Sequence, residues 1–332
     1  MEKSTKIETD RVGKYDSSKR IRGGRNMRHE TIYLYEGRWD VSLTTYVLDD
    51  SGEMLNGKKR PAVLVCPGGA YLGCSDREGE PIAMAFAMMG YHAFVLRYST
   101  YGWDEFRLGL DKMKVKPECV YPAPMREIGM AMKYIKEHEE EWLVDKERVA
   151  ICGFSAGAHN CAMYATHWHM PVVTEFFGLD KEVFRPAACI LGYCLSDYTY
   201  MEEYTLDDAG AVELFHGANI SYLGTKDVTK EQLEMVSPIR FVTDETPPTF
   251  LWATAADELV PVQHTIRMAH ALADKNVPFE VHIFEEGSHG LALATQATSA
   301  GNFQMDADAE KWLGLADAWL RKRFSIFGKE EK

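Results

Sequence analysis

Residues 148–157 read Arg-Val-Ala-Ile-Cys-Gly-Phe-Ser-Ala-Gly and are the strongest indication of the fold in this chain. The apolar run 148–152 predicts a short buried strand, and the run 156–165 predicts a helix. A chain that turns sharply from strand to helix needs small residues beside the serine, because the turn packs against neighbouring backbone. The turn would lift the hydroxyl of Ser155 above the sheet, next to the positive end of the helix. Ser155 is therefore the candidate nucleophile.

Apolar runs on both sides of this stretch alternate with helical patterns. The predicted strands are 31–35, 43–48, 62–66, 91–96, 148–152, 187–193, 249–255 and 279–284. Besides the helix after Ser155, the predicted helices are 81–89, 125–135, 262–272 and 312–319. The first two strands are expected to pair antiparallel, whereas strands separated by helices form a parallel sheet with helices on both faces. We therefore predict the α/β class, with about eight strands in a mostly parallel sheet.

Two segments lie outside this pattern. Residues 1–28 are polar and basic, so we expect a flexible leader, with a regulatory or partner-binding arm as the alternative. Residues 29–328 are expected to form one domain, because α/β folds of this size are often single units. Within them, residues 198–236 show few strand-like runs and many aromatic side chains. They predict an insertion over the strand ends, which is either a lid or a plain connecting segment.

The composition excludes several classes of protein. Of the 332 residues, 46% are hydrophobic and 26% are charged, which allows a large core and argues against disorder. No apolar run approaches the ~18 residues of a membrane span, and a net charge of −13 argues against nucleic-acid binding. The seven cysteines lack CxxC spacing, and the N-terminus lacks the apolar core of a secretory signal. We therefore expect a reduced cytoplasmic protein without membrane or nucleic-acid partners; its oligomeric state stays open.

A serine hydroxyl becomes nucleophilic only with a base beside it, and the base needs a carboxylate to orient it. We expect the acid and then the histidine after late strands. Asp257 is the first carboxylate after the run 249–255, and Glu258, one residue further into the turn, is its rival. His289 follows the last predicted strand in a loop of small residues. We predict Ser155, Asp257 and His289 as a catalytic triad.

The other histidines fit the role of base less well. His159 lies four residues after Ser155 on the same predicted helix, where we expect a packed side chain. His167 and His169 could splay as a metal pair, but no third ligand is evident nearby. The predicted chemistry requires neither a metal nor an organic cofactor, so we expect none.

The loop after the first predicted parallel strand reads Cys-Pro-Gly-Gly-Ala-Tyr at residues 66–71. Consecutive small residues let the backbone approach a substrate without interference from side chains. We predict an oxyanion hole formed by the N–H groups of Gly69, Ala70 and Ala156. A phosphate-binding loop is disfavoured because no Gly-Lys-Ser/Thr follows, and the GxGxxG dinucleotide pattern is absent here.

These motifs together resemble the α/β-hydrolase superfamily, and within it bacterial esterase/lipase-type enzymes grouped with acetylxylan and feruloyl esterases. The matching segments are Pro-Gly-Gly-Ala-Tyr at 67–71, Gly-Tyr-His-Ala-Phe-Val-Leu-Arg-Tyr-Ser at 90–99, Gly-Phe-Ser-Ala-Gly-Ala-His at 153–159, Pro-Pro-Thr-Phe-Leu-Trp-Ala-Thr-Ala-Ala-Asp at 247–257, Asp-Glu-Leu-Val-Pro at 257–261 and Gly-Ser-His-Gly at 287–290. The chain departs from lipase relatives at one motif, since they carry His-Gly-Gly-Gly where this sequence has Pro-Gly-Gly-Ala at 67–70. Ala70 retains its N–H, so the predicted oxyanion hole survives.

The resemblance implies removal of small acyl groups from plant-polysaccharide fragments. We therefore predict a serine esterase that hydrolyses short acyl esters, with acetyl as the first choice, of carbohydrates such as xylan fragments. Its expected partner is a small-molecule or oligosaccharide ester. The alternative is an amide or peptide hydrolase, similar to formamidases or oligopeptidases, with the same triad. A third hypothesis is a non-catalytic binding protein built on the same fold.

Aromatic and charged residues near the predicted oxyanion loop are candidates for substrate contact. Tyr71 and Trp103 could line a cleft, because aromatic rings suit the faces of sugars. Residues 76–78, Asp-Arg-Glu, could reach the rim of the site, but a solvated charged turn is the favoured expectation.

Overall fold

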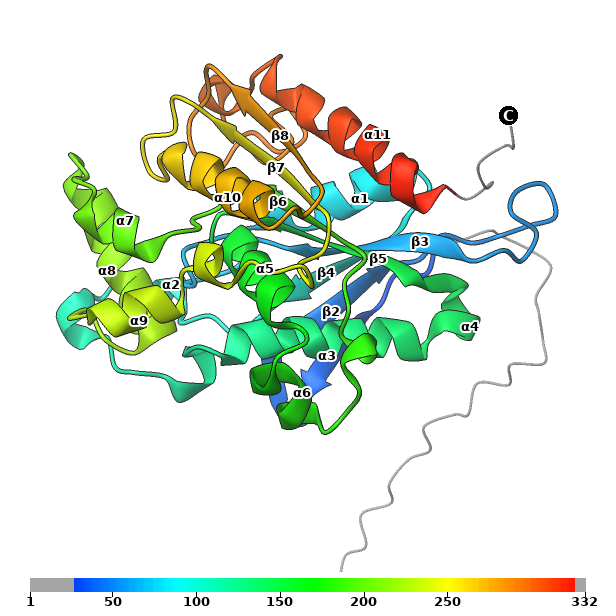
Figure 1. The fold of residues 1–332 in the computed structure, drawn as a ribbon, viewed down its shortest axis with the longest axis horizontal. Coiled ribbons are helices and arrows are strands. Elements are labelled where there is room, and N and C mark those ends of the chain that lie inside the picture. Colours follow the sequence, from blue (N-terminus) through cyan, green and yellow to red (C-terminus); the bar gives the residue numbers. More distant parts are fainter. Residues whose placement is uncertain (1–26, 326–332) are drawn as a thin grey trace, which may run out of the picture.

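An eight-stranded sheet runs through the computed structural model of this protein, which describes residues 27–325 (Figure 1). The strand order is β1-β2-β4-β3-β5-β6-β7-β8. The pairs β1–β2 and β2–β4 are antiparallel, and all neighbours from β4 to β8 are parallel. This confirms the predicted α/β fold. The strands are β1 (Thr31–Tyr35), β2 (Arg38–Tyr46), β3 (Arg60–Cys66), β4 (His92–Arg97), β5 (Val144–Phe154), β6 (Ala188–Gly192), β7 (Thr249–Thr254) and β8 (Phe279–Phe284).

Helices cover both faces of this sheet. The longer helices of the covering layers are α1 (Glu80–Met88), α3 (Ala123–Glu137), α5 (Ala156–His167), α10 (Gln263–Asp274) and α11 (Trp312–Phe324). The chain also contains the short helices α2 (Trp103–Phe106), α4 (Glu139–Trp142) and α6 (Pro171–Phe177). The predicted leader at 1–28 lies outside the described residues except for its last two, and so do residues 326–328 of the predicted domain. That residues 29–328 form one domain therefore stays a prediction.

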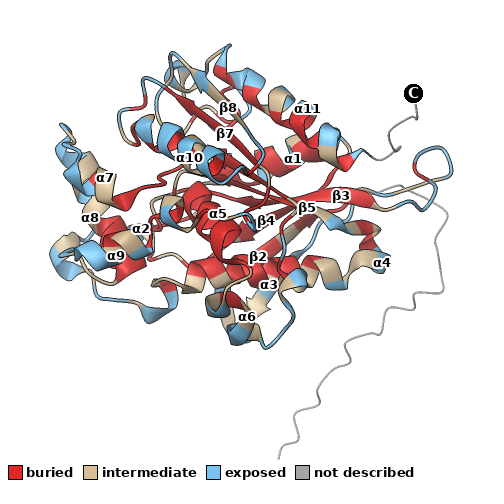
Figure 2. Cartoon of the chain, in the orientation of Figure 1, coloured by how far each residue is buried: buried red, intermediate tan, exposed pale blue. Residues whose placement is uncertain are grey.

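The central strand β3 is buried along its whole length (Figure 2). Its side chains alternate between the two faces of the sheet, as strand geometry requires. Leu64 packs into the core cluster that holds the apolar residues of α3 and α5, whereas Val65 packs into the cluster that holds those of α1 and α11. Burial on both faces explains why the sequence of this strand is an unbroken apolar run.

Two strands are longer than their sequences predict. β2 begins at Arg38 and β5 at Val144, and in both the added residues are mostly polar and partly exposed. An apolar run marks only the buried part of a strand, because the exposed part needs no apolar side chains. The expected bounds of β8 agree with the structure.

The predicted insertion at 198–236 folds into three helices, α7 (Tyr198–Glu203), α8 (Ala209–Leu223) and α9 (Lys230–Met235). They lie together at one side of the molecule, at the left in Figure 1. The sequence did not predict the 15-residue α8. Its apolar and small residues surround the helix instead of forming one stripe, so the helical period is hidden.

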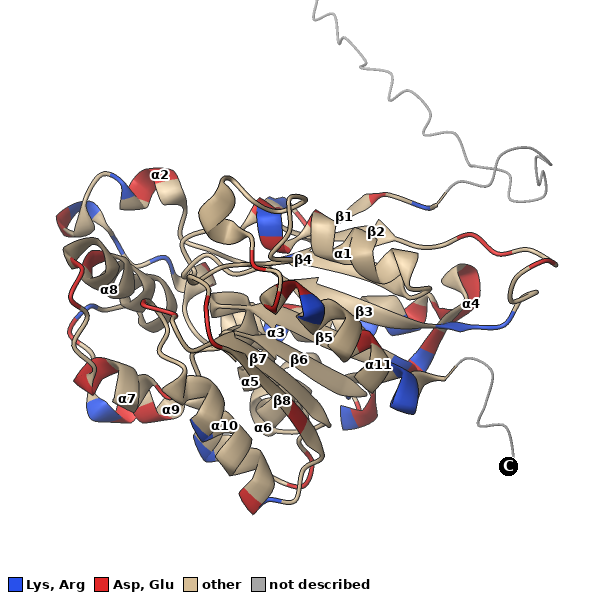
Figure 3. Ribbon diagram, turned by 90° about the horizontal axis from the view of Figure 1, so that it is seen from above, with Lys and Arg blue, Asp and Glu red and all other residues tan. Residues whose placement is uncertain are grey.

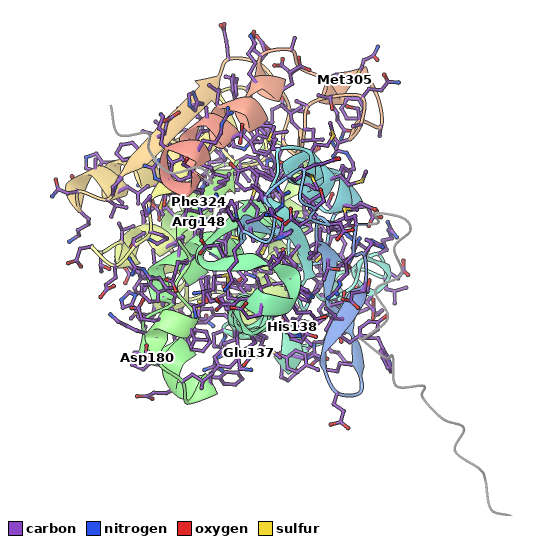
Figure 4. The ribbon with its side chains drawn as sticks, turned by 90° about the vertical axis from the view of Figure 1, so that its right-hand side faces the viewer. Glu137, His138, Arg148, Asp180, Met305 and Phe324 are labelled. Carbon is purple, nitrogen blue, oxygen red and sulfur yellow. The ribbon has the colours of Figure 1, made fainter. Side chains whose placement is uncertain are left out.

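The first half of β5 lies beside the end of α11, and Ser155 follows the opposite end of this strand. Arg148 Nη1 donates to the carbonyl oxygens of Phe324 at 3.3 Å and Ser325 at 2.8 Å (Figure 4). The charged residues lie mostly on the helices and loops around the sheet (Figure 3). Among residues 27–325, none of the helices combines the length and the apolar character needed to cross a bilayer.

Candidate active site

Ser155 occupies the turn between the last residue of β5 and the first residue of α5. Its backbone has φ 51° and ψ −122°, a conformation that L-residues rarely adopt and that costs about 1–3 kcal/mol. The turn is tight: a Cβ on Gly153 would lie 2.3 Å from the carbonyl oxygen of Gly157. Only glycine therefore fits at position 153 of the motif.

The structure brings the three predicted triad residues together. His289 Nε2 lies 2.8 Å from Ser155 Oγ, and His289 Nδ1 lies 2.7 Å from Asp257 Oδ2. The other oxygen of Asp257 accepts hydrogen bonds from the backbone N–H groups of Leu259 and Val260, at 3.0 and 2.9 Å. Because a carboxylate can only accept, the proton of the neutral imidazole lies on Nδ1, and Nε2 is free to accept from the serine hydroxyl.

The electrostatics of His289 suit a base. Its side chain is 14% exposed and that of Asp257 is 1% exposed. Burial alone would lower the pKa of His289, but the adjacent carboxylate of Asp257, helped by that of Glu78, outweighs burial and raises the pKa above its ordinary value. The imidazolium that forms when the base takes a proton is thus stabilised.

The predicted oxyanion loop lies against the serine. A Cβ on Gly68 would lie 2.8 Å from the Cβ of Ser155, so only glycine fits there. The next three residues, Gly69, Ala70 and Tyr71, all have positive φ values of 130°, 54° and 57°. This strained backbone curls the loop beside the nucleophile, and Ala70 lines the same pocket as Ser155 and Ala156.

An apolar pocket of about 50 Å³ opens beside the Ser155 hydroxyl. The insertion supplies much of its wall, so this segment forms part of the site. Tyr71 lines the pocket as well. Its lining residues are Ala70, Tyr71, Ser155, Ala156, His159, Leu195, Tyr198, Met201, Ala211, Leu214, Phe215, Ala218, Leu259 and Val260.

Trp103 lies elsewhere. Its indole Nε1 would be 2.2 Å from a Cβ on Gly73, so the ring covers the far end of the oxyanion loop, and 37% of the residue is exposed. The structure therefore separates the two aromatic residues that the sequence suggested for substrate contact: Tyr71 is in the pocket and Trp103 is on the surface.

His159 is fully buried and lines the pocket. Its Nδ1 lies 2.6 Å from the hydroxyl of Tyr71, and its Nε2 lies 2.8 Å from the carbonyl oxygen of Val236. Burial lowers the pKa of His159 to about 4, so the ring is neutral at pH 7. Since the carbonyl can only accept, Nε2 carries the proton and Nδ1 accepts from Tyr71. The ring thus links the oxyanion loop to the end of the insertion.

Glu78 is buried beside the site, although the sequence favoured an exposed position for it. The expectation of a solvated turn at 76–78 is wrong for this residue, which is only 3% exposed, although Asp76 is indeed exposed. Glu78 lies in the short 3-10 helix η1 (Asp76–Glu78), and its partners are at Gly68 and Tyr193. No local pattern marks it, because its burial depends on segments distant in the chain.

The site shows no grouping suited to a metal ion. Within the described residues 27–325, no three His, Cys, Asp or Glu side chains are placed to hold an ion together. His167 Nδ1 donates to the carbonyl oxygen of Met163 at 2.8 Å, within its own helix.

This chain is similar to known proteins in sequence and in fold. Residues 53–272 match the BD-FAE family. The chain is 32% identical over 295 residues to endo-1,4-beta-xylanase B of Butyrivibrio fibrisolvens, a match that covers 85% of this chain and 40% of the xylanase. The chain spans less than half the length of the first curated relatives it matches.

Solved structures match over nearly their full length. The carboxylesterase Cest-2923 of Lactobacillus plantarum is 28% identical with a TM-score of 0.73, and the match covers 90% of this chain and 98% of that one. An acetyl ester-xyloside bifunctional hydrolase of Caldicellulosiruptor lactoaceticus is 27% identical with a TM-score of 0.69, covering 92% and 100%. Together with the strand order and the strand–turn–helix at Ser155, these matches show that the chain belongs to the BD-FAE family of α/β hydrolases.

Proposed function

We propose that this protein is a serine esterase that removes short acyl groups, with acetyl as the first choice, from carbohydrates such as xylan fragments. The observation that carries the proposal is the 2.8 Å contact of Ser155 Oγ with His289 Nε2, whose other nitrogen is paired with Asp257. Nucleophile, base and orienting acid stand in the order and at the distances that acyl transfer requires.

In the proposed first half-reaction, Ser155 Oγ bonds to the ester carbonyl carbon while His289 Nε2 accepts the hydroxyl proton. The carbonyl electron pair moves to the oxygen, which the N–H groups of Gly69, Ala70 and Ala156 stabilise. The tetrahedral intermediate then collapses: the bond to the alcohol oxygen breaks, and the alcohol takes the proton from His289. An acyl group remains on Ser155.

The second half-reaction releases the acid. Water attacks the acyl carbon while His289 accepts its proton, and the proton passes to Ser155 Oγ as the bond between Oγ and the acyl carbon breaks. Asp257 holds the imidazole in its useful tautomer and stabilises its charged form in both halves. The two steps regenerate the free enzyme and give one carboxylic acid and one alcohol.

The choice of substrate rests on two further observations. The pocket beside Ser155 is apolar and small, about 50 Å³, which favours a short acyl chain over a long one. Two relatives are named as a xylanase and as an acetyl ester-xyloside hydrolase, which supports an acylated xylan fragment as the source of the ester.

All seven cysteines are free, which supports the further proposal of a reducing, cytoplasmic location.

A fluorophosphonate probe tests the nucleophile. We expect it to label the wild-type protein and to leave Ser155→Ala unlabelled, and we expect p-nitrophenyl acetate hydrolysis to follow the same pattern. Equal labelling of both proteins would refute the role of Ser155. A protein that neither reacts with the probe nor cleaves the ester would favour the non-catalytic hypothesis.

A substrate panel tests the specificity. We expect acetylated xylan fragments to have a higher kcat/KM than feruloylated or longer-acyl substrates. A preference for feruloyl esters would overturn the choice of acyl group. Cleavage of amides or peptides without cleavage of esters would instead support the alternative hydrolase.

A further inference from the structure

Glu78 has a buried carboxylate that the proposed mechanism does not use. One of its oxygens accepts a hydrogen bond from the backbone N–H of Gly68 at 2.8 Å, and the other lies 2.6 Å from the hydroxyl of Tyr193. Gly68 is the residue that packs against the Cβ of Ser155, directly before the predicted oxyanion donors. One end of the carboxylate therefore holds the start of the oxyanion loop.

Tyr193 links Glu78 to the loop that contains His289. Its hydroxyl accepts a hydrogen bond from the backbone N–H of Ala292 at 3.1 Å, so its own proton points to Glu78. Ala292 is three residues after His289 in the same loop. The Tyr193 ring also packs edge-on against the imidazole, with ring centroids 5.0 Å apart and planes at 70°.

The backbone of Tyr193 is strained, with φ at 37°. A residue other than glycine is held in this region only when its surroundings over-determine it. Two hydrogen bonds and one ring contact fix the side chain here: the donation to Glu78, the acceptance from Ala292 and the packing on His289. The strain is consistent with a side chain whose position matters to the site.

We propose that Glu78, acting through Gly68 and Tyr193, is a positioning residue. It fixes the positions of the oxyanion loop and the His289 loop relative to Ser155. The inference rests on the proposed esterase function and deepens it. Glu78 does not touch the reacting atoms; it fixes the two loops that do. Small displacements of such loops are costly, because acyl transfer depends on near-attack geometry.

The charge of Glu78 also acts on the base. The groups that face His289 are Asp257 from the turn after β7, Ser155 from the turn before α5, Tyr193 from the end of β6 and Glu78 from η1. Arg77 is the nearby cation: it donates to the carbonyl oxygen of Thr298, and its Nη1 would lie 3.9 Å from a Cβ on Gly290. Burial lowers the pKa of His289, Asp257 raises it by more, and Glu78 adds a smaller effect in the same direction as Asp257.

The test compares three variants by their pH profiles with p-nitrophenyl acetate. In Glu78→Gln, we expect kcat to fall on the order of 10- to 100-fold with KM nearly unchanged, and the acid limb of kcat/KM to move to lower pH. In Tyr193→Phe, the ring and the charge of Glu78 remain, so we expect a lower kcat with the acid limb in place. The control Glu286→Gln removes an exposed carboxylate three residues before His289 and should alter neither kcat nor the acid limb.

The outcomes separate this inference from the proposed function. A folded Glu78→Gln with the kcat and acid limb of an active wild type would overturn the inference alone. If Glu78→Gln does not fold, as judged by thermal unfolding, Tyr193→Phe decides, and an unchanged kcat there would overturn it. A wild type without hydrolysis that depends on Ser155 would overturn the proposed function, and this inference with it.

Discussion

Gly157 lies directly against the backbone of Cys66: a Cβ at position 157 would be 2.1 Å from the Cys66 carbonyl oxygen. This contact joins the first turn of α5 to the end of β3. It brings the loop that follows β3 beside Ser155. The last glycine of the GxSxG motif is therefore needed for assembly of the site as well as for the turn itself.

Gly157→Ala should lower both stability and activity. The added methyl group meets backbone that cannot move alone, so we expect a loss of about 1–3 kcal/mol in the free energy of unfolding, and a lower kcat because the oxyanion loop is displaced. The matched control is Gly314→Ala in α11, where, apart from its chain neighbours and the adjacent backbone of its own helix, no heavy atom of the described residues lies within 4 Å of the new Cβ. That variant should gain up to about 1 kcal/mol. Denaturant unfolding measures both, and equal stabilities would contradict the packing argument.

Replacing Ser155 by two different residues separates catalysis from backbone strain. Both Ser155→Ala and Ser155→Gly should lose on the order of 10⁴–10⁶ in kcat. Because alanine keeps the strained φ of 51° and glycine tolerates it, the glycine variant should be more stable than the alanine variant by about 1 kcal/mol. A glycine variant that is less stable than the alanine variant would show that the turn is not strained. Thermal unfolding and kcat are the measurements.

Asp257→Asn should reduce kcat on the order of 10³- to 10⁴-fold while leaving the fold intact. The amide oxygen can still accept from Leu259 and Val260, but the amide nitrogen would face His289 Nδ1 and cannot accept its proton. Glu258→Gln is the matched control, since Glu258 is the exposed neighbour that the sequence offered as a rival. Its kcat should equal that of the wild type. A larger loss in the Glu258 variant than in the Asp257 variant would reverse the assignment.

The pH dependence of kcat/KM should show an acid limb above pH 6.5, the ordinary pKa of histidine. His289 must be neutral to accept the proton of Ser155, and Asp257 raises its pKa against the effect of burial. Activity is therefore lost as the pH falls through this raised pKa. The profile of p-nitrophenyl acetate hydrolysis between pH 4 and 9 measures the limb. A limb clearly below 6.5 would mean that burial dominates at His289.

Leu214→Ala should shift the acyl preference towards longer chains. Leu214 lies on the face of α8 that lines the pocket beside Ser155, so its truncation enlarges that pocket. Val212→Ala is the control, because Val212 lies on the same helix but lines a different pocket, which does not include Ser155. The ratio of kcat/KM for p-nitrophenyl butyrate to that for the acetate should rise only in the Leu214 variant. A rise in both would point to a general loosening of α8.

The fold and the candidate triad followed from short stretches of sequence. Buried strands appear as apolar runs, and the turn at Ser155 needs glycines wherever it occurs, so both features are visible locally. The positions of Asp257 and His289 followed from the order of strands, because the carboxyl ends of parallel strands meet at one edge of a sheet. Their catalytic roles stay predictions.

Other features depend on how distant segments pack together. Local patterns in the sequence are enough to predict an α/β sheet that carries a serine on a tight turn. The sequence left open the shape of the pocket, because the wall formed by α7 and α8 depends on how an insertion packs across the strand ends. It also hid Glu78, whose hydrogen-bond partner Tyr193 lies 115 residues away. A buried carboxylate is stable only when donors reach it, and no local pattern shows that a residue as distant as Tyr193 will supply one of them.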